Sequence, residues 1–127
     1  MTVQHRDLAS GGWRNLTLIE QLANTGSEVE RALNWAAKAN SEYSHRAVER
    51  ALELLDLTIA DPRHRHRLKE LTRLREVLLD YFTGENEFGS TPRSWHNYFH
   101  PYGMAIAIQK QMNRARLEPR SKSEPRP

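Results

Sequence analysis

Residues 41–62 read SEYSHRAVERALELLDLTIADP, and this stretch decides which fold the chain can adopt. Its apolar residues recur at helical spacing and, at roughly 100° per residue, cover about half of the helix circumference. A helix with so wide an apolar surface must lie at the centre of a fold or share that surface with a partner. Ser41 is the expected N-cap. Asp61-Pro62 ends this helix and begins the next, because Asp caps a helix and Pro favours its first position.

The segments on both sides carry the same kind of pattern. Thr17 followed by Glu20 is a capping box that opens a helix before this stretch, and Thr91-Pro92 opens another after it. No alternating strand pattern and no Asn-Gly or Asp-Gly turn occurs, so the expected fold class is all-α. Since the connections are mostly short, we expect an up-and-down antiparallel four-helix bundle. The expected helices cover residues 17–38, 41–60, 62–83 and 91–113.

The spacing of apolar residues also predicts which side of the third and fourth helices faces the core. In the third helix the expected buried set is Leu68, Leu71, Leu74, Leu78 and Phe82. In the fourth helix the expected buried set is Trp95, Phe99, Tyr102 and Ile106. Arg75 falls in the same sector as the leucines, so its guanidinium needs a carboxylate at the rim of the bundle, and Glu30 is the candidate.

The charge of the chain is concentrated at its end. The net charge is +3. Residues 113–127 alone hold five basic and two acidic side chains, which leaves the rest of the chain neutral. This end is rich in Pro and Ser and has no aromatic residue, so we expect residues 114–127 to be a disordered basic tail. Residues 1–16 are an expected flexible N-terminal segment, and residues 17–113 are the expected bundle.

Several function classes are excluded by composition. The chain has no cysteine, which excludes disulfides, thiolate zinc sites and cysteine nucleophiles. No stretch has the length and apolar character of a signal peptide or a membrane span. We therefore expect a cytoplasmic protein that has no membrane association, cofactor or metal.

The start of the third helix, PRHRHRLKELTRLR, is strongly basic. The side chains that could form a nucleic-acid-binding stripe opposite the leucines are Arg65, Lys69 and Arg73, with His66 beside them. Glu76 and Asp80 reverse the sign of this stripe within about two turns, which does not suit a phosphate backbone. The competing interpretation is a solvated helix face paired with acidic residues of other helices.

Residues 93–102, RSWHNYFHPY, hold the candidate catalytic residues. Arg93 and His100 lie close together in helical projection, with His96 to one side, opposite the expected core residues. An Arg followed after six residues by a His resembles the motif of HEPN-domain ribonucleases. The resemblance implies that Arg93 binds phosphate and that His100 acts as acid and base in RNA cleavage. Pro101 does not fit this pattern, because we expect the helix to kink or restart there.

Two other interpretations of these residues remain. His96 and His100, at i and i+4, could share a metal ion, but a zinc site needs further ligands and no HExxH glutamate is present, so we expect no metal. In the second interpretation Arg93, His96 and His100 are simply the solvated side of the fourth helix.

Three stretches resemble a recurring class of small microbial helical proteins: LANTGSEVERALNW (22–35), the run from 50 to 91, and SWHNYF (94–99). The resemblance implies one compact helical bundle and no particular activity. The acidic loop GENEFGS (84–90) lies within it and is either a turn held by a buried aromatic or a recognition surface.

Excess apolar surface favours an interaction protein. The candidate partner-binding residues are Trp35, Leu52, Ile59 and Phe88. We therefore expect a non-enzymatic protein that forms a homo-oligomer or docks on a larger protein assembly. The alternative is an RNA-binding or HEPN-like ribonuclease bundle that uses Arg93 and His100.

Overall fold

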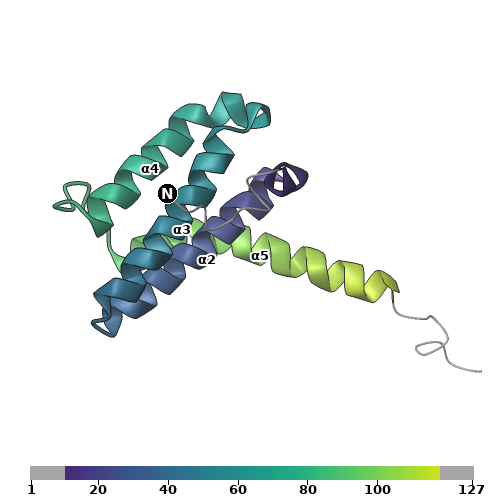
Figure 1. Cartoon of the computed structure of the whole chain (residues 1–127). Coiled ribbons are helices and arrows are strands. Elements are labelled where there is room, and N and C mark those ends of the chain that lie inside the picture. Colours follow the sequence, from purple (N-terminus) through teal and green to yellow (C-terminus); the bar gives the residue numbers. More distant parts are fainter. Residues whose placement is uncertain (1–10, 118–127) are drawn as a thin grey trace, which may run out of the picture.

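The computed structural model describes residues 11–117, and every regular element in this range is helical (Figure 1). Two short 3-10 helices accompany four α-helices, and the described range contains no strand, which confirms the all-α fold class. The elements are η1 (Gly12–Asn15), α2 (Leu18–Ala37), α3 (Ser41–Ile59), η2 (Pro62–Arg67), α4 (Leu68–Phe82) and α5 (Pro92–Leu117).

Helix α2 packs against both α3 and α5 and runs antiparallel to each. The Ser44 hydroxyl donates to the carbonyl oxygen of Ala32 at 2.9 Å, so the start of α3 lies beside the end of α2. Glu30 lies beside His96 and Gly26 beside Phe99, which fixes the direction of α5. The main core cluster consists of Leu22, Val29, Ala51, Leu55, Leu71, Leu74, Leu78, Trp95 and Phe99, and Ala32, Ala47 and Val48 form a smaller one.

The wide apolar surface of α3 is covered within one chain. Helix α2 packs on one part of it and α4 on another. Leu52 and Ile59, two candidate partner-binding residues, are half-buried and pack against the core. The central position, one of the two expectations for this helix, therefore accounts for its pattern without a partner.

Local capping signals set the helix boundaries. Thr17 and Glu20 form the expected capping box at the start of α2. The side chain that caps α3 belongs to Asn40, which accepts from the backbone N–H of Tyr43 at 3.0 Å, and not to Ser41 as expected. Asp61 caps the next element as expected, but that element is the 3-10 helix η2, and the α-helix begins only at Leu68.

Four further expectations differ from the structure. Trp13 in η1 is 2% exposed, so residues 12–15 belong to the fold, whereas residues 1–10 lie outside the described range. Leu68, the first residue of α4, is 41% exposed and is not part of the buried set that was expected for this helix. Arg75 bonds to Asp56 at 2.7 Å and not to Glu30, because α4 packs on α3.

The fourth difference concerns α5, which continues through Pro101 and ends at Leu117. Pro101 has no N–H to donate to the carbonyl oxygen of Asn97. Both residues are exposed, so water can donate to that carbonyl instead. Residues 114–117 are therefore helical and not part of a disordered tail, while residues 118–127 lie outside the described range.

A cluster of buried polar side chains joins η1, α2, α3 and η2. Asp61, 2% exposed, accepts from the backbone N–H of Arg63 at 3.0 Å and from its guanidinium at 2.6 Å. Gln21 donates to Asp61 at 3.3 Å and to the carbonyl oxygen of Trp13 at 2.9 Å. His64 bonds through Nε2 to Gln21 Oε1 at 3.0 Å.

These contacts fix the protonation of the cluster. The hydrogen bonds from the Arg63 guanidinium lower the pKa of Asp61 well below its ordinary value, against the opposing effect of burial. Burial lowers the pKa of His64, although the Asp61 charge acts in the other direction. The cluster therefore consists of an ionised Asp61 and, near neutral pH, an uncharged His64.

Replacing Asp61 with Asn should lower the free energy of unfolding by about 1.5–3 kcal/mol at pH 7, because hydrogen bonds to a charged acceptor are lost. The pKa of Asp61 is lowered on folding, so its contribution is complete above the ordinary value of 3.8 and is lost as the pH falls below it. Urea unfolding of wild type and variant at pH 7 and pH 3 should show this difference shrinking.

Asp56→Asn is the matched control. It removes an ion pair in which the Asp56 side chain is 53% exposed, so its effect should stay below about 1 kcal/mol. An Asp61→Asn effect that is independent of pH would contradict the assigned charge state.

Helix α5 approaches α2 closely at Gly26. A methyl group there would lie 2.8 Å from Phe99 Cβ, whereas one on Gly103 would meet no atom within 4 Å. Both glycines are inside helices, where Ala is favoured by up to about 1 kcal/mol.

Gly26→Ala should therefore be less stable than Gly103→Ala by about 1–3 kcal/mol, the usual cost of overpacking a core. Urea unfolding of both variants gives this difference directly. Equal stability would mean that α5 does not contact α2 as closely as described.

Candidate functional site

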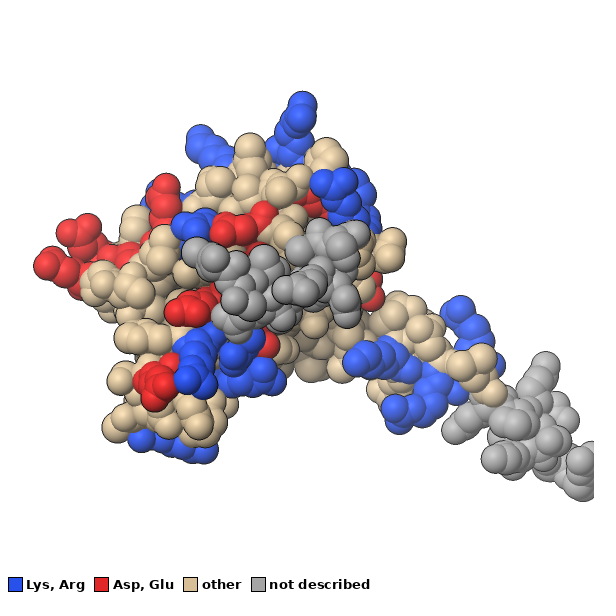
Figure 2. Space-filling view, in the orientation of Figure 1, with Lys and Arg blue, Asp and Glu red and all other residues tan. Residues whose placement is uncertain are grey.

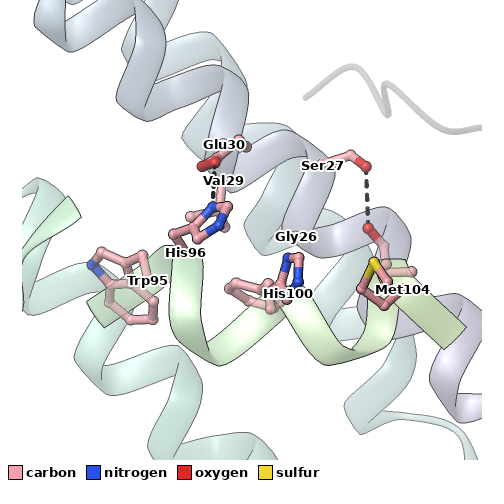
Figure 3. A pocket seen from close by; sticks show the side chains of 11 residues that line it. Gly26, Ser27, Val29, Glu30, Trp95, His96, His100 and Met104 are labelled. Atoms are coloured by element: carbon pink, nitrogen blue, oxygen red, sulfur yellow. Dashed lines mark hydrogen bonds and ion pairs between the residues drawn. The ribbon is translucent and has the colours of Figure 1, made fainter. Parts of the chain in front are cut away.

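A groove of about 230 Å³ lies between α2 and α5 (Figure 3). The α5 side chains at its edge include His96, His100 and Met104, and the α2 residues opposite them include Gly26, Ser27 and Glu30. Because Gly26 has no side chain, Phe99 packs directly on the α2 backbone and closes the floor. The polar groups therefore gather along the rim.

The rim brings together two of the three candidate catalytic residues. His96 Nδ1 lies 3.0 Å from Glu30 Oε1, and Figure 3 shows the ring directed at that carboxylate. The rings of His96 and His100 are 5.2 Å apart. Arg93 is exposed in the first turn of α5 and does not line the groove. The described residues that line the groove thus offer two imidazoles and a carboxylate, and no guanidinium to bind phosphate is among them.

The His96–Glu30 contact contributes little to the stability of the fold. The two side chains are 58% and 46% exposed, and a pair this exposed contributes about 0–1 kcal/mol. Within residues 11–117, no group of three or more His, Asp or Glu side chains is placed to hold a metal ion.

The basic stripe begins on η2 and continues on α4. Arg65, His66, Lys69 and Arg73 are all exposed. The Arg73 guanidinium also lies 4.8 Å from the centroid of the Phe88 ring, where it stacks on the loop that follows α4. The stripe is therefore exposed along its length, and one of its cations is engaged with an aromatic ring.

The partner-binding candidates also occupy different settings. Trp35 is half-buried, with Tyr43 against its ring at 4.9 Å and the Lys38 ammonium 5.2 Å from its centroid. Phe88 is 47% exposed. Since Leu52 and Ile59 pack against the core, Phe88 is the candidate that offers the most apolar surface to another molecule.

The acidic loop, residues 84–90, holds Phe88 in a defined position. Asp80 accepts from the backbone N–H groups of Glu87 at 2.8 Å and Phe88 at 3.0 Å. Asn86, with a φ of 55°, exchanges two hydrogen bonds with the backbone of Ser90. Glu85 and Glu87 are exposed on this loop. The loop thus displays two carboxylates and one aromatic ring on an ordered backbone.

Beside this loop is a hollow of about 300 Å³ between α4 and α5. Leu74, Val77 and Trp95 form its apolar wall, and Arg73 and Ser90 connect it to the acidic loop. Burial raises the pKa of Tyr98, also in the wall, so its hydroxyl stays protonated and donates to Glu70. Among the described residues, the buried Trp95 indole N–H has no hydrogen-bond partner.

The second half of α5 projects from the other helices (Figure 1). We call residues 104–117 the arm. Every residue from 107 to 117 is exposed. Met104, Ile108 and Met112 are 46%, 50% and 53% exposed. Each step of four residues turns a helix by about 40°, so these side chains form one apolar stripe along the arm.

The charge of the arm has a single sign. Its charged residues are Lys110, Arg114 and Arg116, and the whole of α5 contains no Asp or Glu. Figure 2 shows these basic side chains along the projecting helix, whereas acidic side chains gather at the opposite end of the view, where the acidic loop lies. The arm is therefore a basic amphipathic helix.

Sequence reasoning missed the arm, although its signal was present. Met104, Ile108 and Met112 have the spacing of an apolar helix face. Because the helix was expected to kink or restart at Pro101, the sequence did not show that these residues continue one helix beyond the core.

Comparisons of the chain with protein-family models, with curated proteins and with solved structures found no match. Within the described residues, no helix combines the length and apolar character needed to cross a membrane.

If the arm stripe has no structural role in the single chain, Ile108→Glu and Met112→Glu should each change the free energy of unfolding by less than about 0.5 kcal/mol. Leu55→Ala, at a fully buried position, should lower it by about 2–5 kcal/mol. Urea unfolding of the dilute protein measures both effects. A loss above 1 kcal/mol for an arm variant would show that the stripe packs within the chain.

Proposed function

We propose that this protein is a non-enzymatic interaction protein that uses the arm to dock on another protein. The observation that carries the proposal is the exposed stripe of Met104, Ile108 and Met112 on a helix that projects from the core. In this proposal the earlier helices form an antiparallel bundle whose role is to hold the arm in place.

An exposed stripe of this kind is best explained by binding. Three apolar side chains at intervals of four residues match the way an amphipathic helix enters an apolar groove of a partner. Met is well suited to such contacts because its flexible side chain adapts to the opposing surface. A helix as short as the arm is only marginally stable by itself, so contact with a partner would also order it.

One observation favours the alternative, an RNA-directed function. Helix α5 has four Arg or Lys side chains and no acidic one, and His96 and His100 lie on its groove side. Phosphate binding would use the cations and would leave the apolar stripe unexplained, because single-stranded nucleic acids stack on aromatic rings and not on Met or Ile. Protein docking accounts for both features and is the function we favour.

A photo-reactive amino acid in place of Gln111, which is exposed at the edge of the stripe, tests the proposal. Irradiation in cell extract treated with nuclease and high salt should crosslink the arm to a protein, and mass spectrometry would identify this chain or another one. The crosslink should disappear in the Ile108→Glu/Met112→Glu background, because glutamates replace the docking side chains.

The matched control has the same photo-reactive residue in place of His45, which is exposed on α3. Crosslinks that persist in the double-glutamate background, or that join the arm only to RNA, would contradict protein docking.

A further inference from the structure

We infer that the partner of the arm is a second copy of this chain, and that the arm binds the acidic loop of that copy and the hollow beside it. This inference rests on the proposed function and names its partner. The contact joins two different surfaces, so each copy can bind one neighbour through its arm and another through its loop.

The arm and the acidic loop carry complementary charge. The arm carries Lys110, Arg114 and Arg116 without an acidic residue, and the loop displays Glu85 and Glu87. Opposite charges on two surfaces of the same chain guide association and set its orientation. Two arms paired with each other would bring six cations together without a carboxylate from either arm, which disfavours arm-to-arm pairing.

The acidic loop and the hollow also offer apolar surface that matches the stripe of the arm. Phe88 is 47% exposed beside the carboxylates, and the hollow of about 300 Å³ next to it has a wall of Leu74, Val77 and Trp95. A Met or Ile side chain fits a hollow of that character. The stripe supplies three such side chains, flanked by the cations that face the carboxylates.

The acidic loop is already ordered in the single chain. Asp80 and Asn86 hold the loop by hydrogen bonds to its backbone, so little ordering is needed when an arm binds. A recognition surface that is already ordered loses less conformational entropy on association. Arg73, stacked on Phe88, keeps the ring in one position.

The arrangement in space makes the contact intermolecular. The arm and the acidic loop lie at opposite ends of the molecule (Figures 1 and 2), so an arm does not reach its own loop. A contact between two unlike surfaces is head-to-tail, and repetition of it produces either a closed ring or an open chain of copies.

Two variants that each disable one surface test this arrangement. Ile108→Glu/Met112→Glu blocks the arm and leaves the loop intact. Glu85→Lys/Glu87→Lys reverses the loop charge and leaves the arm intact. Sedimentation velocity should show that wild type exceeds the monomer mass of 14.8 kDa as concentration rises, and less so at high salt. Each variant alone should remain monomeric.

The equimolar mixture of the two variants is the decisive sample. The intact arm of one variant should bind the intact loop of the other, giving a one-to-one dimer that grows no further. Circular dichroism of each variant establishes that it is folded before mixing.

Two outcomes overturn the inference. If wild type associates and the Glu85→Lys/Glu87→Lys variant alone, whose arm is intact, associates as well, the arms pair with each other; protein docking then stands while the head-to-tail contact fails. If wild type is monomeric at high micromolar concentration, self-association fails altogether, and the crosslinks of the Gln111 position to other proteins decide separately whether the arm docks at all.

Discussion

The buried carboxylate of Asp61 is the constraint on which the rest of the structure depends. An ionised group with 2% exposure is tolerated only because four donors reach it: the backbone N–H of Arg63, two nitrogens of its guanidinium and the side-chain amide of Gln21. Three of these donors belong to Arg63 in η2, and the fourth comes from α2. The turn from α3 through η2 into α4 is thereby fixed against α2. Trp13, bonded to Gln21 and to the Thr58 hydroxyl, closes the same end of the core.

Local signals allowed much of the helical framework to be predicted from the sequence. The capping box at Thr17 and the Asp-Pro and Thr-Pro starts act over three or four residues, so they can be read without knowledge of the fold. Gln21 and His64 could not be assigned to the core in this way, because a polar residue becomes a core residue only through partners about 40 positions away. The ion-pair partner of Arg75 could not be predicted from the sequence either, since it depends on which helix lies beside α4.

The candidate site likewise had some features that the sequence could predict and others that it could not. The helical projection placed His96 and His100 on one side of α5, and their rings are neighbours. It could not show that Arg93 would lie outside the groove, or that Glu30 would pair with His96, because both depend on how α2 crosses α5. Phe88 was named from its loop setting, and only the hydrogen bonds of Asp80 reveal how firmly that loop is held.

Pro101 gives the arm a degree of mechanical independence. It removes one backbone hydrogen bond between the half of α5 anchored by Trp95 and Phe99 and the half that projects. Fraying from the C-terminal end can therefore stop at this position without loosening the core. We expect the arm to behave as a separate cooperative unit, with rapid amide exchange in a protein whose core amides exchange only on global unfolding. One continuous helix would then contain two levels of stability.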